Sequence, residues 1–198
     1  MGVENLLQGT GVLYLADFGA TEPDNTSIHE APSDTVWTNI GLTQDGVTLS
    51  VSHEWSELEA DQIVDVPDRR LIKREVSIAT NMAEAHLEGL QKALAGATID
   101  DTDESAGASA SGVHVLEPEL INSGVGPPHY RAVLFDGFAP GGFIRRVILR
   151  RAVNTSDIES AYKKDEQTLI PVEFHGHYVS AEVAPWRIID QVAVPTGS

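Results

Sequence analysis

Two histidines and a glutamate late in the chain have the types and spacing that could support chemistry. His175 and His177 are separated by one residue, and Glu182 follows five residues later. Residues two apart on a strand face the same side, so both imidazoles could reach one metal ion. Imidazole and carboxylate groups are common metal ligands. One hypothesis is therefore a metal enzyme that uses these three residues, and it predicts stoichiometric metal in the purified protein.

The rest of the sequence argues against catalysis. The histidine pair resembles the first metal motif of cupins, but the flanking glycines are absent, and the last sixteen residues, where a second motif would lie, contain no histidine. The absence of cysteine excludes disulfides, cysteine nucleophiles and thiolate metal sites. No nucleophile-elbow, phosphate-loop or dinucleotide-binding motif occurs. We therefore expect two partly exposed strand histidines, no catalytic site and no cofactor.

The charge of the chain is strongly acidic and uneven. Thirty acidic and thirteen basic residues give a formal net charge of −17. This argues against a nucleic-acid reader, because phosphate binding needs lysine and arginine. Residues 1–68 hold thirteen acidic residues and no Lys or Arg, whereas most basic residues form clusters. The clusters are Arg69-Arg70, Lys73-Arg74, Arg145-Arg146, Arg150-Arg151 and Lys163-Lys164. An acidic half and basic clusters in one chain favour head-to-tail self-association.

Two strongly alternating segments organise the elements that position these residues. Apolar and polar residues alternate over residues 47–55 and again over 72–79, which predicts two half-buried strands. The fifteen residues between them, 56–70, are charged and contain a proline. Connections of this length are usually functional or disordered. The sequence therefore predicts a long inter-strand arm loop over residues 56–70.

The remaining pattern predicts a mainly β protein. A helix is expected from Asn81, which has capping-box spacing to Glu84, to Gly96 at its C-terminal end. A second capping box predicts a short helix over 156–163, and residues 100–112 form a low-complexity insertion without large apolar residues. Further strands are expected over 10–18, 36–40, 112–118, 131–138, 143–152, 169–179 and 184–194. We expect one domain over 1–198, a β-sandwich or barrel with one flanking α-helix.

The order of these segments resembles a known family, the major tail (tail tube) proteins of long non-contractile-tailed bacteriophages, particularly those infecting actinobacteria. The similarity is carried by an early strand, a second strand, a turn into the long acidic arm, the helix, and three late segments. In order, these are GVLYLADFGA (11–20), VWTNIG (36–41), DGVTL (45–49), EVSIAT (75–80), residues 81–94, RRAVNTSD (150–157), YKKD (162–165) and TLIPVEF (168–174). The insertion over 100–112 departs from the compact family pattern.

The resemblance implies a structural virion protein. In this family six subunits form a ring whose strands join into a barrel, and rings stack into a tube around a tape-measure protein. Tail-tip and tail-terminator proteins complete the tail, and genomic DNA passes through the lumen without specific binding. The resemblance thus implies a tail-tube-like fold, assembly in the host cytoplasm and a final location in the virion tail. Neither a signal peptide nor a membrane-spanning segment is visible in the sequence.

The resemblance and the charge pattern together give candidate contact residues. In the family, the long loop commonly helps to join adjacent rings, a role that residues 56–70 would take here. The expected inter-ring or inter-subunit contacts are Leu58, Glu59, Asp61, Ile63, Val64, Asp65, Arg69, Arg70, Arg145, Arg146, Arg150 and Arg151. Excess negative charge in the lumen would let DNA slide without adhering. Two other possibilities remain open: a β-sandwich ligand-binding module such as a lectin, and a tube subunit of the related type VI secretion system.

Overall fold

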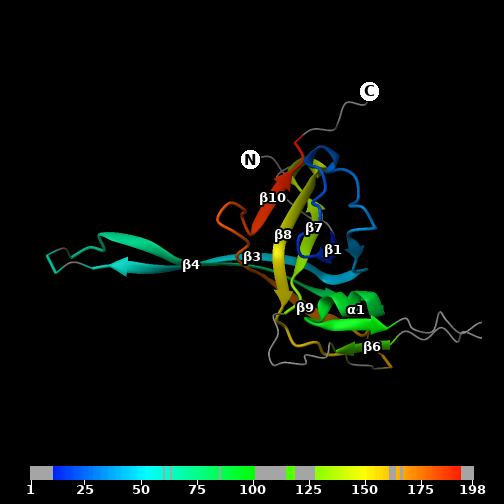
Figure 1. Cartoon of the computed structure of the whole chain (residues 1–198). Coiled ribbons are helices and arrows are strands. Elements are labelled where there is room, and N and C mark those ends of the chain that lie inside the picture. The colour runs from blue at the N-terminus through cyan, green and yellow to red at the C-terminus, as the bar shows by residue number, and fades with distance from the viewer. Residues whose placement is uncertain are drawn as a thin grey trace, which may run out of the picture.

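The fold is mainly β, with one large antiparallel sheet and one flanking helix (Figure 1). A computed structural model describes residues 11–59, 61–62, 64–84, 86–100, 115–118, 128–160, 164–165 and 167–192. The sheet has eight strands in the order β2-β1-β7-β8-β9-β4-β3, and β10 pairs with β8 beside this path. The expectation of a β-sandwich-like protein with one flanking α-helix is confirmed.

The strands of the large sheet differ greatly in length. They are β1 (Val12–Asp17), β2 (Thr38–Asn39), β3 (Thr43–Leu58), β4 (Asp68–Met82), β7 (Arg131–Phe138), β8 (Ile144–Asn154), β9 (Ile170–Gly176) and β10 (Trp186–Asp190). A separate two-stranded sheet joins β5 (Ala97–Asp100) to β6 (Val115–Pro118), and helix α1 (Leu87–Ala93) contacts β5. Short 3-10 turns lie at Asn25–Ser27 and Pro140–Gly142.

The main hydrophobic core lies between the two ends of the curled sheet. Leu13, Val133 and Leu149 from the β1-β7-β8 end pack with Ile78 and Phe174 from the β9-β4-β3 end. Because side chains alternate along a strand, each of these strands sends every second residue into this core. Burial of such large aliphatic and aromatic side chains contributes about 1.5–3 kcal/mol each.

A second core lies on the other face of β7 and β8. Leu134 and Ile148 pack there with Ala132 and with Trp37, whose indole Nε1 donates a hydrogen bond to the Thr21 carbonyl oxygen. The irregular segment 18–37 thus covers the second face, and the central strands are buried on both sides. This explains the continuous buried run from Arg146 to Leu149 in β8.

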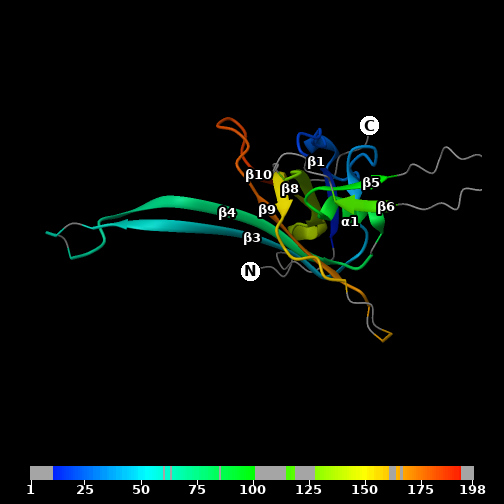
Figure 2. The same cartoon turned by 60° about the horizontal axis from the view of Figure 1, so that its bottom comes forward.

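The β3–β4 hairpin is half inside and half outside the body. The two strands pair from Thr43–Met82 out to Leu58–Asp68, but β9 pairs only with Ser77 to Met82 of β4. We call residues 51–76, which extend beyond β9, the arm, and residues 58–67 the arm tip. Both views show the arm projecting away from the body (Figures 1 and 2).

The predicted helix over 81–96 is wrong at its start. Asn81 and Met82 belong to β4, where Met82 is fully buried and pairs with Thr43 on one side and Ile170 on the other. Helix α1 begins only at Leu87, after His86 at the N-cap position. Burial and ladder pairing of Met82 outweigh the roughly 1 kcal/mol that an Asn cap would contribute. The C-cap of helix α1 is Leu94. Gly96 has a φ of 112° but lies two residues beyond Leu94, so it does not directly follow the C-cap.

Other predicted boundaries also shift. The arm loop of residues 56–70 shortens to 59–67, because pairing continues through Leu58 and Asp68. The second predicted helix is not present over the described residues 156–160; there the Ser156 and Asn154 side chains accept hydrogen bonds from the Glu173 backbone N–H. Parts of three predicted segments lie outside the described residues: 101–112 of the insertion, 112–114 of the strand over 112–118, and 161–163 of the second helix. Strand β5 was not predicted.

Truncation of the central core aromatic should strongly destabilise the subunit. Phe174 is fully buried, so Phe174→Ala leaves a cavity and should lower the free energy of unfolding by about 3–5 kcal/mol in urea titrations. Tyr178→Ala, two residues beyond β9 at a side chain that is 66% exposed, is the control and should change stability by less than about 0.5 kcal/mol. Equal effects of the two changes would contradict this assignment of the core.

Candidate self-association surface

The arm has one apolar face and one polar face. Val51 and Trp55 lie on the face that continues the main core, opposite Val76 and Leu71 respectively. The Trp55 indole stacks on His53 of the same face, with ring centroids 6.1 Å apart. The other face carries the cross-strand pairs Ser52–Glu75, Glu54–Lys73 and Ser56–Arg70. The arm is therefore an amphipathic two-stranded ribbon.

The apolar face of the arm is open to solvent. Trp55 is 53% exposed, and Leu71, Val51 and Ile72 are also exposed. Ile72 is the extra residue of an irregularity in β4, where three residues face Glu54 and Trp55 of β3. A two-stranded ribbon alone is at best marginally stable in water. Contiguous exposed apolar surface of this kind marks an interaction site.

The structure brings together the arm residues that the sequence singled out. Leu58, Glu59, Asp61, Val64, Asp65, Arg69 and Arg70 all lie exposed at or beside the arm tip, and Ile63 is outside the described residues. Arg69 donates to the Glu57 carboxylate at 2.8 Å across the two strands. Exposed ion pairs contribute only about 0–1 kcal/mol each. This pair therefore aligns the strands more than it stabilises them.

Arg146 is not an external contact residue, contrary to the sequence-based expectation. Its side chain is 1% exposed, and its Nε and Nη2 atoms each donate to Asp136 at 2.7 Å. Nη2 also donates to the carbonyl oxygen of Glu30 at 2.9 Å. Neighbouring strand residues face opposite sides, so Arg146 points into the second core, while Arg145 lies on the other face near the end of β8, where its side chain is only partly covered. Arg146 fastens the covering segment 18–37 to β8.

Arg145 lies on the surface and is paired within the same chain. Its Nε and Nη2 atoms donate to the two carboxylate oxygens of Asp190 in β10, both at 2.6 Å. These hydrogen bonds raise the pKa of Arg145 and lower the pKa of Asp190. The pair ties β10 to β8 and leaves Arg145 only partly available to a neighbour.

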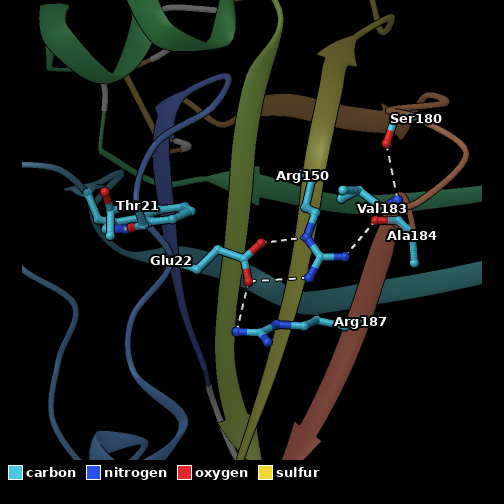
Figure 3. Close-up of polar contacts among 8 residues, drawn as sticks. Thr21, Glu22, Arg150, Ser180, Val183, Ala184 and Arg187 are labelled. Atoms are coloured by element: carbon cyan, nitrogen blue, oxygen red, sulfur yellow. Dashed lines mark hydrogen bonds and ion pairs between the residues drawn. The ribbon is translucent and has the colours of Figure 1, made fainter.

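Arg150 and Arg187 share one carboxylate, that of Glu22 (Figure 3). Arg187 reaches it from β10 at 2.8 Å, and Arg150 reaches it from β8 while donating through Nη1 to the Ala184 carbonyl oxygen at 2.6 Å. Three distant segments therefore meet here: the covering segment, the central strand and the strand that follows the 177–185 loop. The sequence offered no signal for Glu22.

An apolar cavity of about 270 Å³ lies beside this cluster. Its walls include Phe18, Trp37, Ile148, Val179 and Val183, and the polar groups at its edge are Glu22 and Arg150. The cavity exists because segment 18–37 and the 177–185 loop meet over β8 without filling the space between them. The cavity could not be predicted from the sequence, because contact between two irregular segments leaves no periodic pattern of apolar residues.

Arg151 lies on the same face as Arg150 because β8 contains one extra residue. Leu149 pairs with Val133 and Ala152 with Arg131, so three steps in β8 match two in β7. The Arg151 guanidinium stacks 3.9 Å from the Tyr130 ring centroid and 5.6 Å from that of Phe18. It donates to the Tyr178 carbonyl oxygen at 3.0 Å. Within the described part of the chain, Arg151 forms no ion pair with a carboxylate.

The histidines that opened the metal hypothesis have different surroundings. His175 lies in β9, 3.2 Å from the Glu173 carboxylate, whereas His177 packs edge-on against Tyr130, with ring centroids 5.4 Å apart. Over the described residues, no group of three or more His, Asp or Glu side chains is placed to hold one metal ion. Nor does any helix in this part of the chain have the length and apolar character needed to cross a membrane.

The buried pair between Arg146 and Asp136 predicts a large effect of breaking it. Arg146→Met should lower the free energy of unfolding by about 3 kcal/mol, because Asp136, which is 16% exposed, is left largely buried without its partner. Arg145→Met, at the adjacent but more exposed position, should cost only about 0–1 kcal/mol. The double change Arg146→Met with Asp136→Leu should recover much of the loss. Chemical denaturation of the three variants measures these values, and equal losses at positions 145 and 146 would contradict the assignment.

His177 should contribute a pH dependence of stability. Burial, and then the positive charges of Arg151 and His175, lower its pKa in the folded state below the ordinary value of about 6.5. The unfolded chain therefore binds the proton first, so the contribution is present above pH 6.5 and is lost as the pH falls below it. His177→Gln should reduce the drop in melting temperature between pH 7.5 and pH 5.5. His53→Gln, on the exposed arm, is the control and should leave the drop unchanged.

No protein-family model and no curated protein matches the chain. A functional assignment therefore depends on the physical properties of the surfaces described above, together with the order of segments in the sequence.

Proposed function

We propose that this chain is the tube subunit of a long non-contractile phage tail, a structural protein that self-assembles into hexameric rings stacked as a conduit for DNA. The observation that carries the proposal is the arm, which extends an amphipathic ribbon of exposed apolar residues beyond the body. Such a ribbon is expected to find its partner in another copy, since a closed or helical array satisfies every subunit in the same way.

Strand edges support assembly into a ring. Within the described residues, β3 is the last strand of the sheet along its whole length, and β4 outside Ser77–Met82 pairs only with β3. Strand β10 pairs only with β8. Open edges of this length invite pairing with another chain, and ring closure removes them. The proposal gives these edges a partner in the neighbouring subunit.

The outer face of the β9-β4-β3 sheet has the character that a DNA conduit needs. Cross-strand neighbours share a face, which places Ser50, Ser77 and His175 in one row and Ser52 beside Glu75 in the next. Most of these side chains are small or polar, and none is a large apolar group; Glu75 is paired with Lys73 of the same face at 2.6 Å. A lumen lined in this way would offer phosphate groups few unpaired cations, so that DNA slides without adhering.

The alternative of a ligand-binding module is favoured most by the apolar cavity beside Glu22 and Arg150, since the larger hollows at the 177–185 loop and beside Leu42 are lined by more polar surface. Ligand pockets usually have volumes of about 300–1,000 Å³. At about 270 Å³ the cavity lies just below this range, and a single apolar anchor suits it better than a drug-sized ligand. The cavity alone also leaves the exposed arm without a role.

Direct imaging of the purified protein at rising concentration tests the proposal. Negative-stain electron microscopy should show rings or hollow tubes, and light scattering should rise above a threshold concentration. A protein that stays monomeric at all concentrations, also after addition of pre-assembled tube fragments as seeds, would overturn the proposal.

Shortening the arm should separate folding from assembly. Replacement of residues 56–70 by Asn-Gly joins Trp55 to Leu71 through a two-residue hairpin turn. The removed residues make no contribution to either core, so the melting temperature should stay within a few degrees of that of the parent. Assembly should be lost. Tubes of normal length from this variant would contradict the role given to the arm.

A further inference from the structure

The region around the apolar cavity is a local excess of positive charge on a strongly acidic protein. Arg150 and Arg187 share Glu22, and Arg151 has no carboxylate partner among the described residues. With Glu182, which precedes Val183 in the 177–185 loop, three positive charges stand against two negative charges and leave a surplus of +1, whereas the whole chain has a net charge of −17. Figure 3 shows the Glu22 carboxylate held between Arg150 and Arg187, beside the loop that carries Val183.

The rim of the cavity is apolar and accessible. Phe18 is 48% exposed, Val183 is 39% exposed and Tyr178 is 66% exposed. Phe18 and Val183 line the cavity itself, and the Tyr178 carbonyl oxygen is held by Arg151 next to it. An apolar socket with positive charge at its edge should bind a segment that combines aliphatic and acidic side chains.

The arm tip has this combination. Leu58, Val64 and Val66 are exposed aliphatic residues, and Val64 has no contact that covers it. Glu59, Asp61 and Asp65 lie between and beside them, and residues 58–67 contain no lysine or arginine. The tip is thus the charge complement of the cavity region, and the arm that carries it projects far from the body (Figure 1).

The tip of one subunit cannot reach its own cavity. The paired part of the arm from Val51 to Leu58 alone spans about 23 Å at 3.3 Å per residue. The base of the arm lies beside the 177–185 loop, where Arg74 and Val76 line one pocket with it, but both views show the outer part of the arm leading well beyond this loop and away from β8 and β10 (Figures 1 and 2). An occupant of the cavity with this composition must therefore come from a second copy of the chain.

We propose that the arm tip of one subunit docks on the cavity of another, with an aliphatic side chain of the tip entering between Phe18 and Val183. Glu59, Asp61 and Asp65 then face the Arg150, Arg151 and Arg187 side of the rim. This inference rests on the proposed tube function and names the surface that the arm meets. An apolar anchor in a small socket surrounded by polar groups has the anatomy of an interface hot spot.

The absence of cysteine allows a direct test by cross-linking. A Val64→Cys protein is mixed with a Val183→Cys protein that carries a size tag, assembly is induced, and disulfides are formed by mild oxidation. The expected product is a covalent heterodimer that joins positions 64 and 183, identified by peptide mass spectrometry. Leu42→Cys, at another apolar residue that is 70% exposed, replaces Val183→Cys in the control, where the yield should be at least about tenfold lower.

The outcomes separate the two proposals. If tubes form but the yield of the 64–183 cross-link does not exceed the yield with Leu42→Cys, the docking site is wrong and the proposed tube function is unaffected. A Val183→Cys protein that forms its disulfide with a different segment of a neighbouring chain would also overturn the docking site. Failure of the parent protein to assemble even with seeds, together with no cross-link, would overturn both proposals.

Charge reversal provides a second test that does not depend on a cysteine entering the cavity. Asp61→Lys with Asp65→Lys should raise the concentration needed for assembly by about tenfold, because two weak attractions become repulsions. Asp34→Lys with Asp165→Lys makes the same change in net charge at exposed positions away from the tip and is the matched control. If the tip and control variants assemble alike, the docking model is wrong.

Discussion

The pairing of β4 is the constraint on which the rest of the structure depends. Over Ser77–Met82 this strand lies between β3 and β9 and sends Ile78 and Met82 into the main core. Over Asp68–Val76 it has only β3 as a partner. The body therefore fixes the base and the direction of the arm. The outer half of β4 keeps an unpaired edge. A ribbon that is anchored at one end but marginal alone at the other is stabilised by whatever covers it.

The second constraint on the fold is the covering of the other face of the central strands by segment 18–37. Segment 18–37 has almost no regular structure, so side chains must hold it in place: Arg146 binds the Glu30 carbonyl oxygen, Arg150 and Arg187 bind Glu22, and Trp37 fills the second core. Arg150 and Arg187 share the single carboxylate of Glu22, and Arg151 forms no ion pair among the described residues, so positive charge stands beside an apolar cavity. A feature that closes one subunit thereby creates a surface suited to an acidic, apolar neighbour.

The sequence predicted the elements with strong period-two alternation and missed those decided by long-range contacts. Residues 47–55 and 72–79 lie in strands as expected, because alternation of apolar and polar residues leaves a clear pattern. The capping-box spacing of Asn81 was misleading, since pairing with Pro171 and Gln44 keeps Asn81 in β4. Treating Arg145 and Arg146 as one external cluster was also wrong, because strand alternation puts two neighbours on opposite faces of the sheet and segment 18–37 covers the face that carries Arg146. Glu22 and the cavity depend on the meeting of irregular segments, for which a single sequence has no local signal.

Net charge determines what kind of contact can build an assembly from this chain. Subunits with a charge of −17 repel one another, and screening at physiological salt acts beyond about 8 Å. Surface ion pairs are too weak to overcome this repulsion singly. In the proposed assembly, apolar burial along the arm would provide attraction that salt does not weaken, and the arginines near Glu22 would reduce the repulsion where the surfaces meet. The acidity of the chain would then favour the geometry in which apolar contact and opposite charge coincide.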